Sequence, residues 1–148
     1  KVHITGTDIS ADATLRLPAG IAMTTRLQYT YQDARDVTNR NDSYYNDQIA
    51  YIPYHSGSLM HGMKWRRWSA NYSFIYTGLR YSQQENILYN RLQPWYTSDL
   101  NIMRTLTLGK TQMRVTLEIN NLFSQDYDVI LNYPMPKRNC AISLDIDM

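Results

Sequence analysis

The sequence predicts an all-β fold, an antiparallel up-and-down meander of about seven long strands. Two observations predict it. Apolar and polar residues alternate along most of the 148 residues with a period of two, which is the period of a strand that has one apolar and one polar face. In addition, tight turns alternate with long loops between these stretches, which favours a meander of hairpins.

Three alternating stretches lie in the first half of the chain. Residues 9–17 carry apolar side chains at odd positions and polar ones at even positions. Residues 21–31 repeat the pattern, with Leu27 among the apolar side chains. The alternation of residues 55–65 is weaker, because His61 shares a face with apolar residues. Each stretch is therefore expected to form a strand with an apolar face.

Four further stretches follow, at residues 68–77, 99–108, 112–120 and 140–148. The predicted strands have about ten residues, which is long for a soluble sheet and suits a tilted membrane strand. One charge, Arg104, falls on the apolar face close to a tight turn. We expect its side chain to reach toward the lipid head groups.

The links between the strands alternate in length. The tight links are residues 18–20, 64–67 and 109–111, and the long links are residues 34–54, 82–94 and 124–136. Short turns at one end and long loops at the other are typical of outer-membrane barrels. The Greek-key connections of a soluble sandwich are not sorted in this way. The long loops are therefore expected outside the cell, with Met148 at the periplasmic rim.

Composition and charge limit the classes of protein to which this chain can belong. Hydrophobic residues make up 43% of the chain and the net charge is +2, which points to no acidic or basic partner. No run reaches the roughly 18 apolar residues that a membrane helix needs, but the alternating strands of a membrane barrel also average to a polar composition. The single cysteine, Cys140, excludes an intrachain disulfide. Because Lys1 is not an initiator methionine and no signal sequence follows, we expect an N-terminal part of the exported protein to precede it.

The sequence contains no complete set of metal ligands. His55 and His61 share a face of one predicted strand, but no cysteine or close carboxylate completes a site. The aspartates around the first long link match no spacing of a calcium loop; they are Asp33, Asp36, Asp42 and Asp47. We therefore expect no metal site and no cofactor, with the histidines solvated or at a membrane interface.

Catalytic and nucleic-acid-binding patterns are also missing from the sequence. Asp99 and Glu118 are carboxylates on the polar faces of neighbouring predicted strands, where a hydrolytic pair is conceivable. Ordinary pairing with Arg114 or Arg26 is the favoured interpretation. The chain has no nucleophile elbow, phosphate loop, dinucleotide fingerprint or basic-aromatic patch. We therefore predict that the protein is not an enzyme and binds no nucleic acid.

The C-terminal segment carries the most informative motif. Its two parts are Asn121-Leu122-Phe123-Ser124-Gln125-Asp126-Tyr127 and Tyr133-Pro134-Met135-Pro136-Lys137-Arg138-Asn139, followed by the last alternating strand. This segment resembles the C-terminal end of the TonB-dependent outer-membrane receptors. The family motif falls on Asn121, Leu122, Phe123, Tyr127, Tyr133, Pro134, Pro136, Arg138 and Asn139. Lys137 departs from the family's preferred glycine, and Met148 departs from its usual terminal aromatic residue.

The resemblance implies a fold and a set of partners. Residues 1–148 would be the C-terminal part of a transmembrane β-barrel of about 22 strands, with the plug domain and the N-terminal strands outside this chain. The last strand would carry the signal for the barrel-assembly machinery at Ile142, Leu144, Ile146 and Met148. Further implied partners are outer-membrane lipid, the TonB complex through the missing N-terminal part, a surface lipoprotein, and a small-molecule chelate or oligosaccharide ligand.

The implied function is TonB-coupled uptake of a scarce solute across the outer membrane of a Gram-negative bacterium. Siderophore-iron complexes, haem, cobalamin and glycans are the implied classes of solute. Two other interpretations stay open. One is a structural or adhesive outer-membrane barrel without transport, and the other is a soluble β-sandwich domain that binds a ligand or acts as an enzyme. A plug domain encoded upstream would separate the first two, and a requirement for detergent would separate both from the third.

Overall fold

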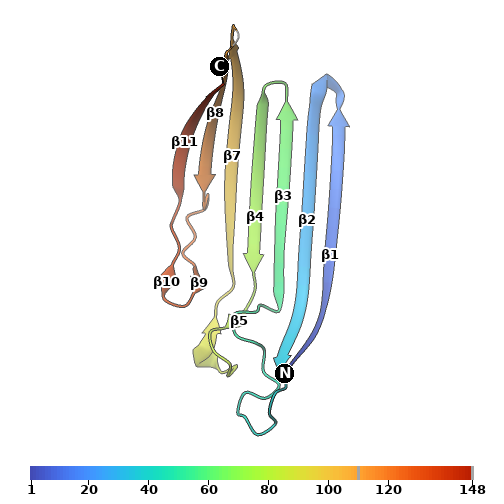
Figure 1. Ribbon diagram of the computed structural model, residues 1–148, viewed down its shortest axis with the longest axis vertical. Helices are drawn as coiled ribbons and strands as arrows, with labels where there is room; N and C mark the ends of the chain where they lie inside the picture. The colour runs from blue at the N-terminus through green and yellow to red at the C-terminus, as the bar shows by residue number, and fades with distance from the viewer. Residues whose placement is uncertain (110, 148) are drawn as a thin grey trace.

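The computed structural model describes residues 1–109 and 111–147, and its main feature is one seven-stranded antiparallel sheet (Figure 1). The strands are β1 (Val2–Leu17), β2 (Ile21–Asp36), β3 (His55–Trp65), β4 (Trp68–Thr77), β7 (Trp95–Leu108), β8 (Thr111–Asn120) and β11 (Asn139–Asp147). Their order in the sheet is their order in the sequence. The predicted up-and-down meander is therefore confirmed. The predicted roles of Lys110, in a tight link, and of Met148, in the last strand, fall outside the described residues.

Several strands are longer than predicted. β1 begins at Val2 rather than residue 9, β2 continues to Asp36 rather than residue 31, and β7 begins at Trp95 rather than residue 99. The ladder between β1 and β2 runs without interruption from Leu17 opposite Ile21 to Val2 opposite Asp36. Backbone hydrogen bonds hold such a ladder whatever the side chains are. The extensions therefore continue past the point where the apolar alternation ends.

The long links contain short elements of their own. β5 (Arg80–Tyr81) pairs with β6 (Arg91–Leu92), and β9 (Asp128–Ile130) pairs with β10 (Tyr133–Pro134). Two 3-10 turns, η1 (Pro18–Gly20) and η2 (Leu88–Asn90), complete the described elements. No helix within the described residues is long and apolar enough to cross a membrane.

The register places all the predicted apolar residues on one side of the sheet, here called the apolar face, and the intervening polar residues on the other, the polar face. One row of directly opposed residues crosses all seven strands: Leu15, Met23, Met63, Ala70, Ile102, Leu117 and Ile142. A shift of one residue in any pair would break this row. The predicted division of the strands into two faces is therefore confirmed.

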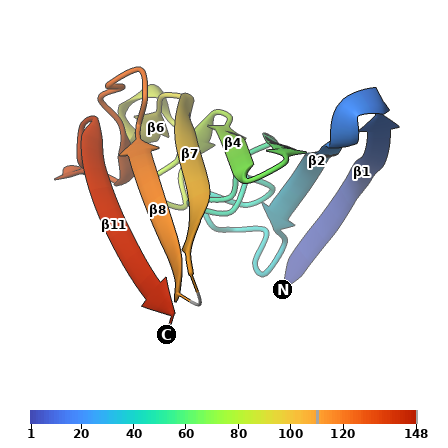
Figure 2. The ribbon, with the colours of Figure 1, turned by 90° about the horizontal axis from the view of Figure 1, so that it is seen from above.

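The sheet has no second layer to cover its apolar face. Among the described residues, Ala34 and Leu92 are the buried apolar residues, whereas Leu27, Leu144 and Ile142 are 48%, 53% and 76% exposed. A soluble sandwich would bury such side chains between two sheets. The seven strands instead form a single curved layer, seen as an arc in Figure 2.

Aromatic residues border the apolar face at both ends. Tyr31 lies toward the long links, and Trp65 and Trp68 lie at the tight turn between β3 and β4. Along β2, Tyr31 is ten residues from Ile21, which is directly opposite Trp65. That separation is about 34 Å along a strand, or about 25 Å in height when the strand is tilted by about 40°, which equals the apolar band of outer-membrane barrels.

Candidate functional site

The polar face contains a hollow at mid-height of β3 and β4. Its volume is about 660 Å³. The polar-face residues that line it are Asp12, Thr14, Thr24, Arg26, Met60, Gly62, Asn71 and Ser73. Because this hollow lies on the side that carries the polar residues, the polar face is the concave side of the arc in Figure 2. Hydroxyl, amide and charged groups, together with Met60, thus surround this hollow.

Gly62 shapes the floor of this hollow. It lies in β3, directly between Thr24 of β2 and Asn71 of β4. A Cβ atom at position 62 would come within 2.9 Å of the Thr24 hydroxyl oxygen and 3.0 Å of the Asn71 amide oxygen. Glycine therefore lets two polar groups from flanking strands approach each other over the sheet. Any larger residue would push them apart.

An ion pair lies at the side of the hollow formed by β1 and β2. The Arg26 Nε donates to Asp12 Oδ1 at 2.6 Å, and the two residues are directly opposite in the ladder. Their side chains are 60% and 63% exposed, so water screens the pair and it adds little to stability. Its main effect is to hold a fixed positive and a fixed negative group on the concave wall.

The structure does not bring His55 and His61 together. Both lie on the apolar face of β3, but six residues separate them by about 20 Å. His61 Nδ1 is 2.8 Å from the Thr25 hydroxyl oxygen, and His55 Nδ1 is 2.8 Å from the Tyr29 hydroxyl oxygen. Each imidazole therefore has its own cross-strand partner.

Each aspartate around the first long link likewise has its own ion-pair or hydrogen-bond partner. Asp33 pairs with Arg35, Asp36 accepts from the Thr38 amide, Asp42 accepts from the Asn39 side chain, and Asp47 accepts from the Asn86 amide. Within residues 1–109 and 111–147, no three His, Cys, Asp or Glu side chains are grouped as metal ligands would be.

Asp99 and Glu118 do not form the ion pairs that were expected. Asp99 Oδ1 accepts a hydrogen bond of 2.8 Å from the Asn121 backbone amide, and Glu118 Oε1 accepts one of 3.4 Å from the Asn101 side chain. Arg26, one of the two expected partners, pairs with Asp12 instead. The expectation was therefore wrong, because a backbone amide and a neighbouring amide side chain are the hydrogen-bond donors to these two carboxylates.

Asn121, the first residue of the motif expected from the resemblance, closes the last long link. Its side-chain Nδ2 donates to the carbonyl oxygens of Gln125 at 2.8 Å and Pro136 at 3.2 Å, and its Oδ1 accepts from the Gln125 amide at 2.9 Å. Only 3% of the residue is exposed. Its φ is 49°, a left-handed conformation that asparagine tolerates better than most residues. One side chain thus joins both ends of the link.

The other motif residues of this link differ in their environment. The Tyr127 ring stacks on Trp95, with centroids 4.6 Å apart. The Leu122 amide donates to the Ser98 carbonyl oxygen at 2.7 Å. Tyr133 and Pro134 form β10. The motif residues whose side chains are exposed are Phe123, Tyr133, Pro134, Pro136, Arg138 and Asn139.

The described residues of the predicted assembly strand have side chains on the apolar face of β11. Ile142, Leu144 and Ile146 all belong to the apolar face and are 76%, 53% and 53% exposed. β11 pairs only with β8, at one edge of the sheet. The fourth predicted position, Met148, lies outside the described residues.

Sequence reasoning missed the polar residues that tie the long links together. Gln48 is 1% exposed and holds the first link through its side chain, which accepts from the Ala34 amide at 2.8 Å. Asn86 of the second link bonds the Gln48 backbone, with its Oδ1 accepting at 2.7 Å and its Nδ2 donating at 3.0 Å. No local pattern distinguishes these residues from solvated loop residues, so only the tertiary contacts reveal them.

Arg80 joins the second and third long links. Its guanidinium donates to the carbonyl oxygens of Gln93 at 3.3 Å, Asp128 at 2.6 Å and Val129 at 3.1 Å. The residue is 2% exposed, and burial lowers the pKa of Arg80 from its ordinary value. The three long links therefore form one connected cap at the same end of the sheet, seen at the bottom of Figure 1.

The sequence was compared with protein-family models and with curated proteins. The family model described as "TonB dependent receptor-like, beta-barrel" matches residues 1–122. This match covers most of the chain and six of the seven strands of the sheet, from β1 to β8. No curated protein matches the chain.

Proposed function

Because the chain belongs to the TonB-dependent receptor family, an outer-membrane protein family of Gram-negative bacteria, we propose that it is the C-terminal part of a barrel that imports a scarce solute. In this proposal residues 1–148 form part of the barrel wall, and a longer protein supplies the plug domain and the remaining strands. Members of the family are transporters rather than enzymes, and the proposed activity is TonB-coupled transport.

The observation that carries this proposal is the division of one curved layer into a convex apolar face and a concave polar face. The apolar face has the height of a bilayer's hydrocarbon region, as estimated above. The concave face has the 660 Å³ hollow, with Asn71, Ser73 and the pair of Asp12 and Arg26 around it. A wall of this kind separates lipid from a wet lumen large enough for a solute.

The polar groups of the wall suit a solute with many hydrogen-bonding atoms. Hydroxyl and amide groups both donate and accept hydrogen bonds. The charges of Asp12 and Arg26 add one group that attracts cations and one that attracts anions. We therefore propose a siderophore-iron complex, haem, cobalamin or a glycan as the solute. The connected cap of long links would form its outer entrance, because ordered loops on a rigid scaffold commonly bind ligands.

The proposal also assigns partners to the parts of the chain. Outer-membrane lipid would cover the apolar face, and the barrel-assembly machinery would bind β11 as the last strand. The TonB complex would act through the N-terminal part of the longer protein. A surface lipoprotein that caps the outer entrance is a further proposed partner.

An uptake experiment tests this function. Uptake of a labelled ferric siderophore, haem, cobalamin and an oligosaccharide is measured in cells with the gene, without it, with it restored, and without TonB. We expect uptake of one solute to fall when either the gene or TonB is removed, and to return on restoration. Unchanged uptake of all four would contradict the proposal and favour a structural or adhesive barrel.

A pair of tryptophan substitutions links this activity to the hollow. Ser73→Trp places a large ring in the hollow, whereas Ser143→Trp places the same ring on the polar face of β11, away from it. We expect Ser73→Trp to slow uptake of the same solute at least tenfold and Ser143→Trp to leave it nearly unchanged. Equal uptake by both variants would exclude the hollow as part of the solute's path.

A further inference from the structure

A groove on the apolar face lies beside the turn between β3 and β4. Trp65 ends β3, Trp68 begins β4, and the two residues are directly opposite in the ladder. The groove has a volume of about 360 Å³ and is lined by Met63, Trp65, Trp68, Ser69, Ala70 and Ile102. Nearly every lining side chain is apolar, so the groove suits a hydrocarbon chain better than a polar ligand.

Two guanidinium groups cover the tryptophan rings of this groove. The Cζ of Arg66 lies 5.2 Å from the centroid of the Trp65 ring, and the Cζ of Arg104 lies 4.8 Å from that of Trp68. Arg104 comes from β7, where it is directly opposite Trp68. Arg104 therefore lies as a cation over an aromatic ring, and its reach toward lipid head groups stays a prediction. This contact leaves the N–H donors of both guanidiniums available.

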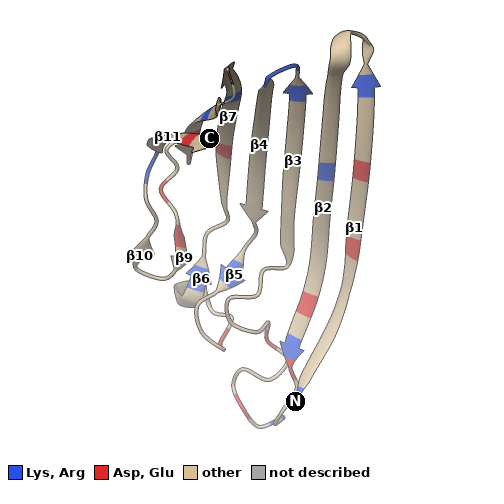
Figure 3. Cartoon of the chain, turned by 45° about the horizontal axis from the view of Figure 1, so that its top comes forward, with Lys and Arg blue, Asp and Glu red and all other residues tan. Residues whose placement is uncertain are grey.

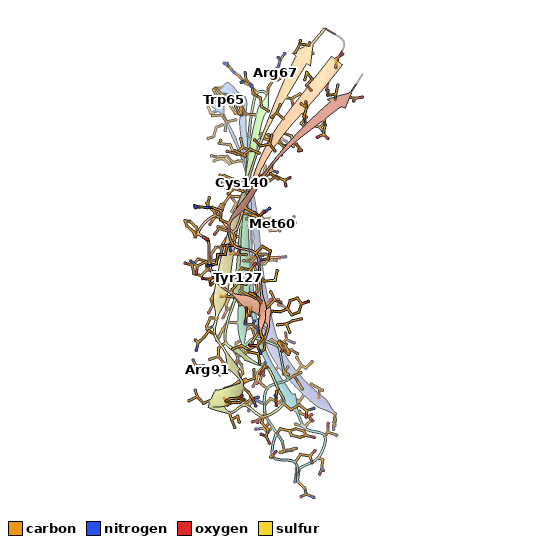
Figure 4. The ribbon with its side chains drawn as sticks, turned by 90° about the vertical axis from the view of Figure 1, so that its left-hand side faces the viewer. Met60, Trp65, Arg67, Arg91, Tyr127 and Cys140 are labelled. Atoms are coloured by element: carbon orange, nitrogen blue, oxygen red, sulfur yellow. The ribbon has the colours of Figure 1, made fainter. Side chains whose placement is uncertain are left out.

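Within the described residues, no ion pair involves the basic residues of this region. Lys64 and Arg67 add two more cations to the same turn, and Figure 3 shows the basic residues gathered there at the end of β3. The ion pairs found within residues 1–109 and 111–147 all lie elsewhere in the chain. Figure 4 places Trp65 and Arg67 toward the tight-turn end of the sheet, away from Arg91 in the long links.

We propose that this groove binds one anionic phospholipid of the inner leaflet of the outer membrane. An acyl chain would lie in the groove over Trp65 and Trp68, and the phosphate would accept hydrogen bonds from Arg66 and Arg104. Guanidinium groups match phosphate oxygens in geometry as well as charge. The inner leaflet follows from the proposed orientation, with tight turns in the periplasm, so this inference rests on the proposed function.

The groove's position favours a lipid over a free phosphate or a protein. It opens on the apolar face, whose large apolar side chains are exposed or half-buried in all seven strands. A free phosphate would leave the hydrocarbon lining of the groove uncovered. Basic residues next to an apolar membrane surface attract anionic head groups over zwitterionic ones. The groove would hold the acyl chain, and the two guanidiniums would donate hydrogen bonds to the phosphate. The site therefore matches both parts of a phospholipid.

Native mass spectrometry of the intact receptor tests this site. The receptor is released from nanodiscs of phosphatidylcholine with one-fifth phosphatidylglycerol, and the retained lipids are counted. We expect one retained phosphatidylglycerol in the natural protein. Retention should weaken about 30-fold in R66Q/R104Q, because each basic group near an anionic surface contributes about fivefold. R66K/R104K keeps both charges and should retain most of the preference for phosphatidylglycerol.

Two control variants distinguish loss of the lipid site from a general effect of substitution. Arg91→Gln removes an exposed arginine from the long links and should not change lipid retention. Trp65→Leu/Trp68→Leu should weaken retention of both lipids, since it removes the aromatic lining of the groove and also the rings over which the two guanidiniums lie. If the receptor inserts with tight turns in the periplasm but R66Q/R104Q retains phosphatidylglycerol like the natural protein, the lipid site is wrong while the proposed function stands. If the receptor does not insert at all, the proposed function itself has failed.

Discussion

At the scale of single residues, Asn121 shows what the first residue of the expected motif does in the structure. The position needs a left-handed backbone, two donors and one acceptor at once, because it joins the beginning of the last long link to Gln125 and Pro136. Few residues other than asparagine meet these needs together. The motif at this position therefore encodes the closure of a loop rather than a contact with solute.

Asn121→Ala should open the link. The change removes three hydrogen bonds and leaves a Cβ residue at positive φ, at a total cost of about 3 kcal/mol. If local opening limits proteolysis, cleavage within residues 124–136 by a protease added to intact cells should be about 100-fold faster. Asn121→Gly accepts the positive φ without strain and should therefore separate the backbone contribution from the hydrogen bonds. An Asn121→Ala protein as resistant as the natural one would show that the side chain does not hold the link.

Residue roles were predictable only where the chain repeats a known motif. Asn121 could be singled out from the sequence, although its hydrogen bonds could not. Gln48 and Arg80 gave no local signal, because each is buried by partners far away in the sequence. The expected partners of Asp99 and Glu118 were wrong for a related reason. The choice of a partner on a polar face depends on side-chain reach, which alternation alone does not encode.

At the scale of strands, alternation predicted which segments pair and which face each residue occupies. β3 and β4 match their predicted ranges, since a tight turn of two residues fixes both inner ends. The outer ends of β1, β2 and β7 were not predictable, because backbone pairing continues after the apolar pattern stops. β5, β6, β9 and β10 were also missed. Such short strands depend on the packing of the loops more than on their own sequences.

A pair of arginine substitutions on β11 tests the faces. Ile142→Arg places a cation on the apolar face, where it costs about 2–4 kcal/mol near the midplane of a bilayer. Ser143→Arg places the same cation on the polar face, one residue further on. We expect Ile142→Arg to reduce the folded barrel in outer-membrane fractions, measured by heat-dependent mobility in gels, and Ser143→Arg to have little effect. Similar yields of the two variants would mean that the faces have been assigned with the wrong register.

At the scale of the whole molecule, residues 1–109 and 111–147 form an open layer rather than a closed unit. β1 and β11 lie at the two edges of the sheet, with unpaired backbone groups on their outer sides. The convex face exposes Leu27, Ile142 and Leu144. Such a layer is stable only when lipid covers the face and further strands pair with the edges.

The isolated chain should therefore not be a soluble monomer. We expect residues 1–148 expressed alone to aggregate, to need detergent, or to associate so that copies supply the missing strands. Sedimentation in detergent-free buffer measures this directly. A monodisperse species of 17.4 kDa, with Leu27, Leu117 and Leu144 protected from solvent, would instead favour the soluble β-sandwich.

The most direct test of the barrel account is the side of the membrane on which the links lie. In a Cys140→Ala background, which removes the only natural cysteine, single cysteines replace Asn41, Gln84 and Asn132 in the long links and Ala19 and Arg67 in the tight ones. A membrane-impermeant maleimide is then added to intact and to permeabilised cells. We predict labelling of the three long-link positions in intact cells, and of the two tight-link positions only after permeabilisation. Equal labelling of both sets in intact cells would contradict the account.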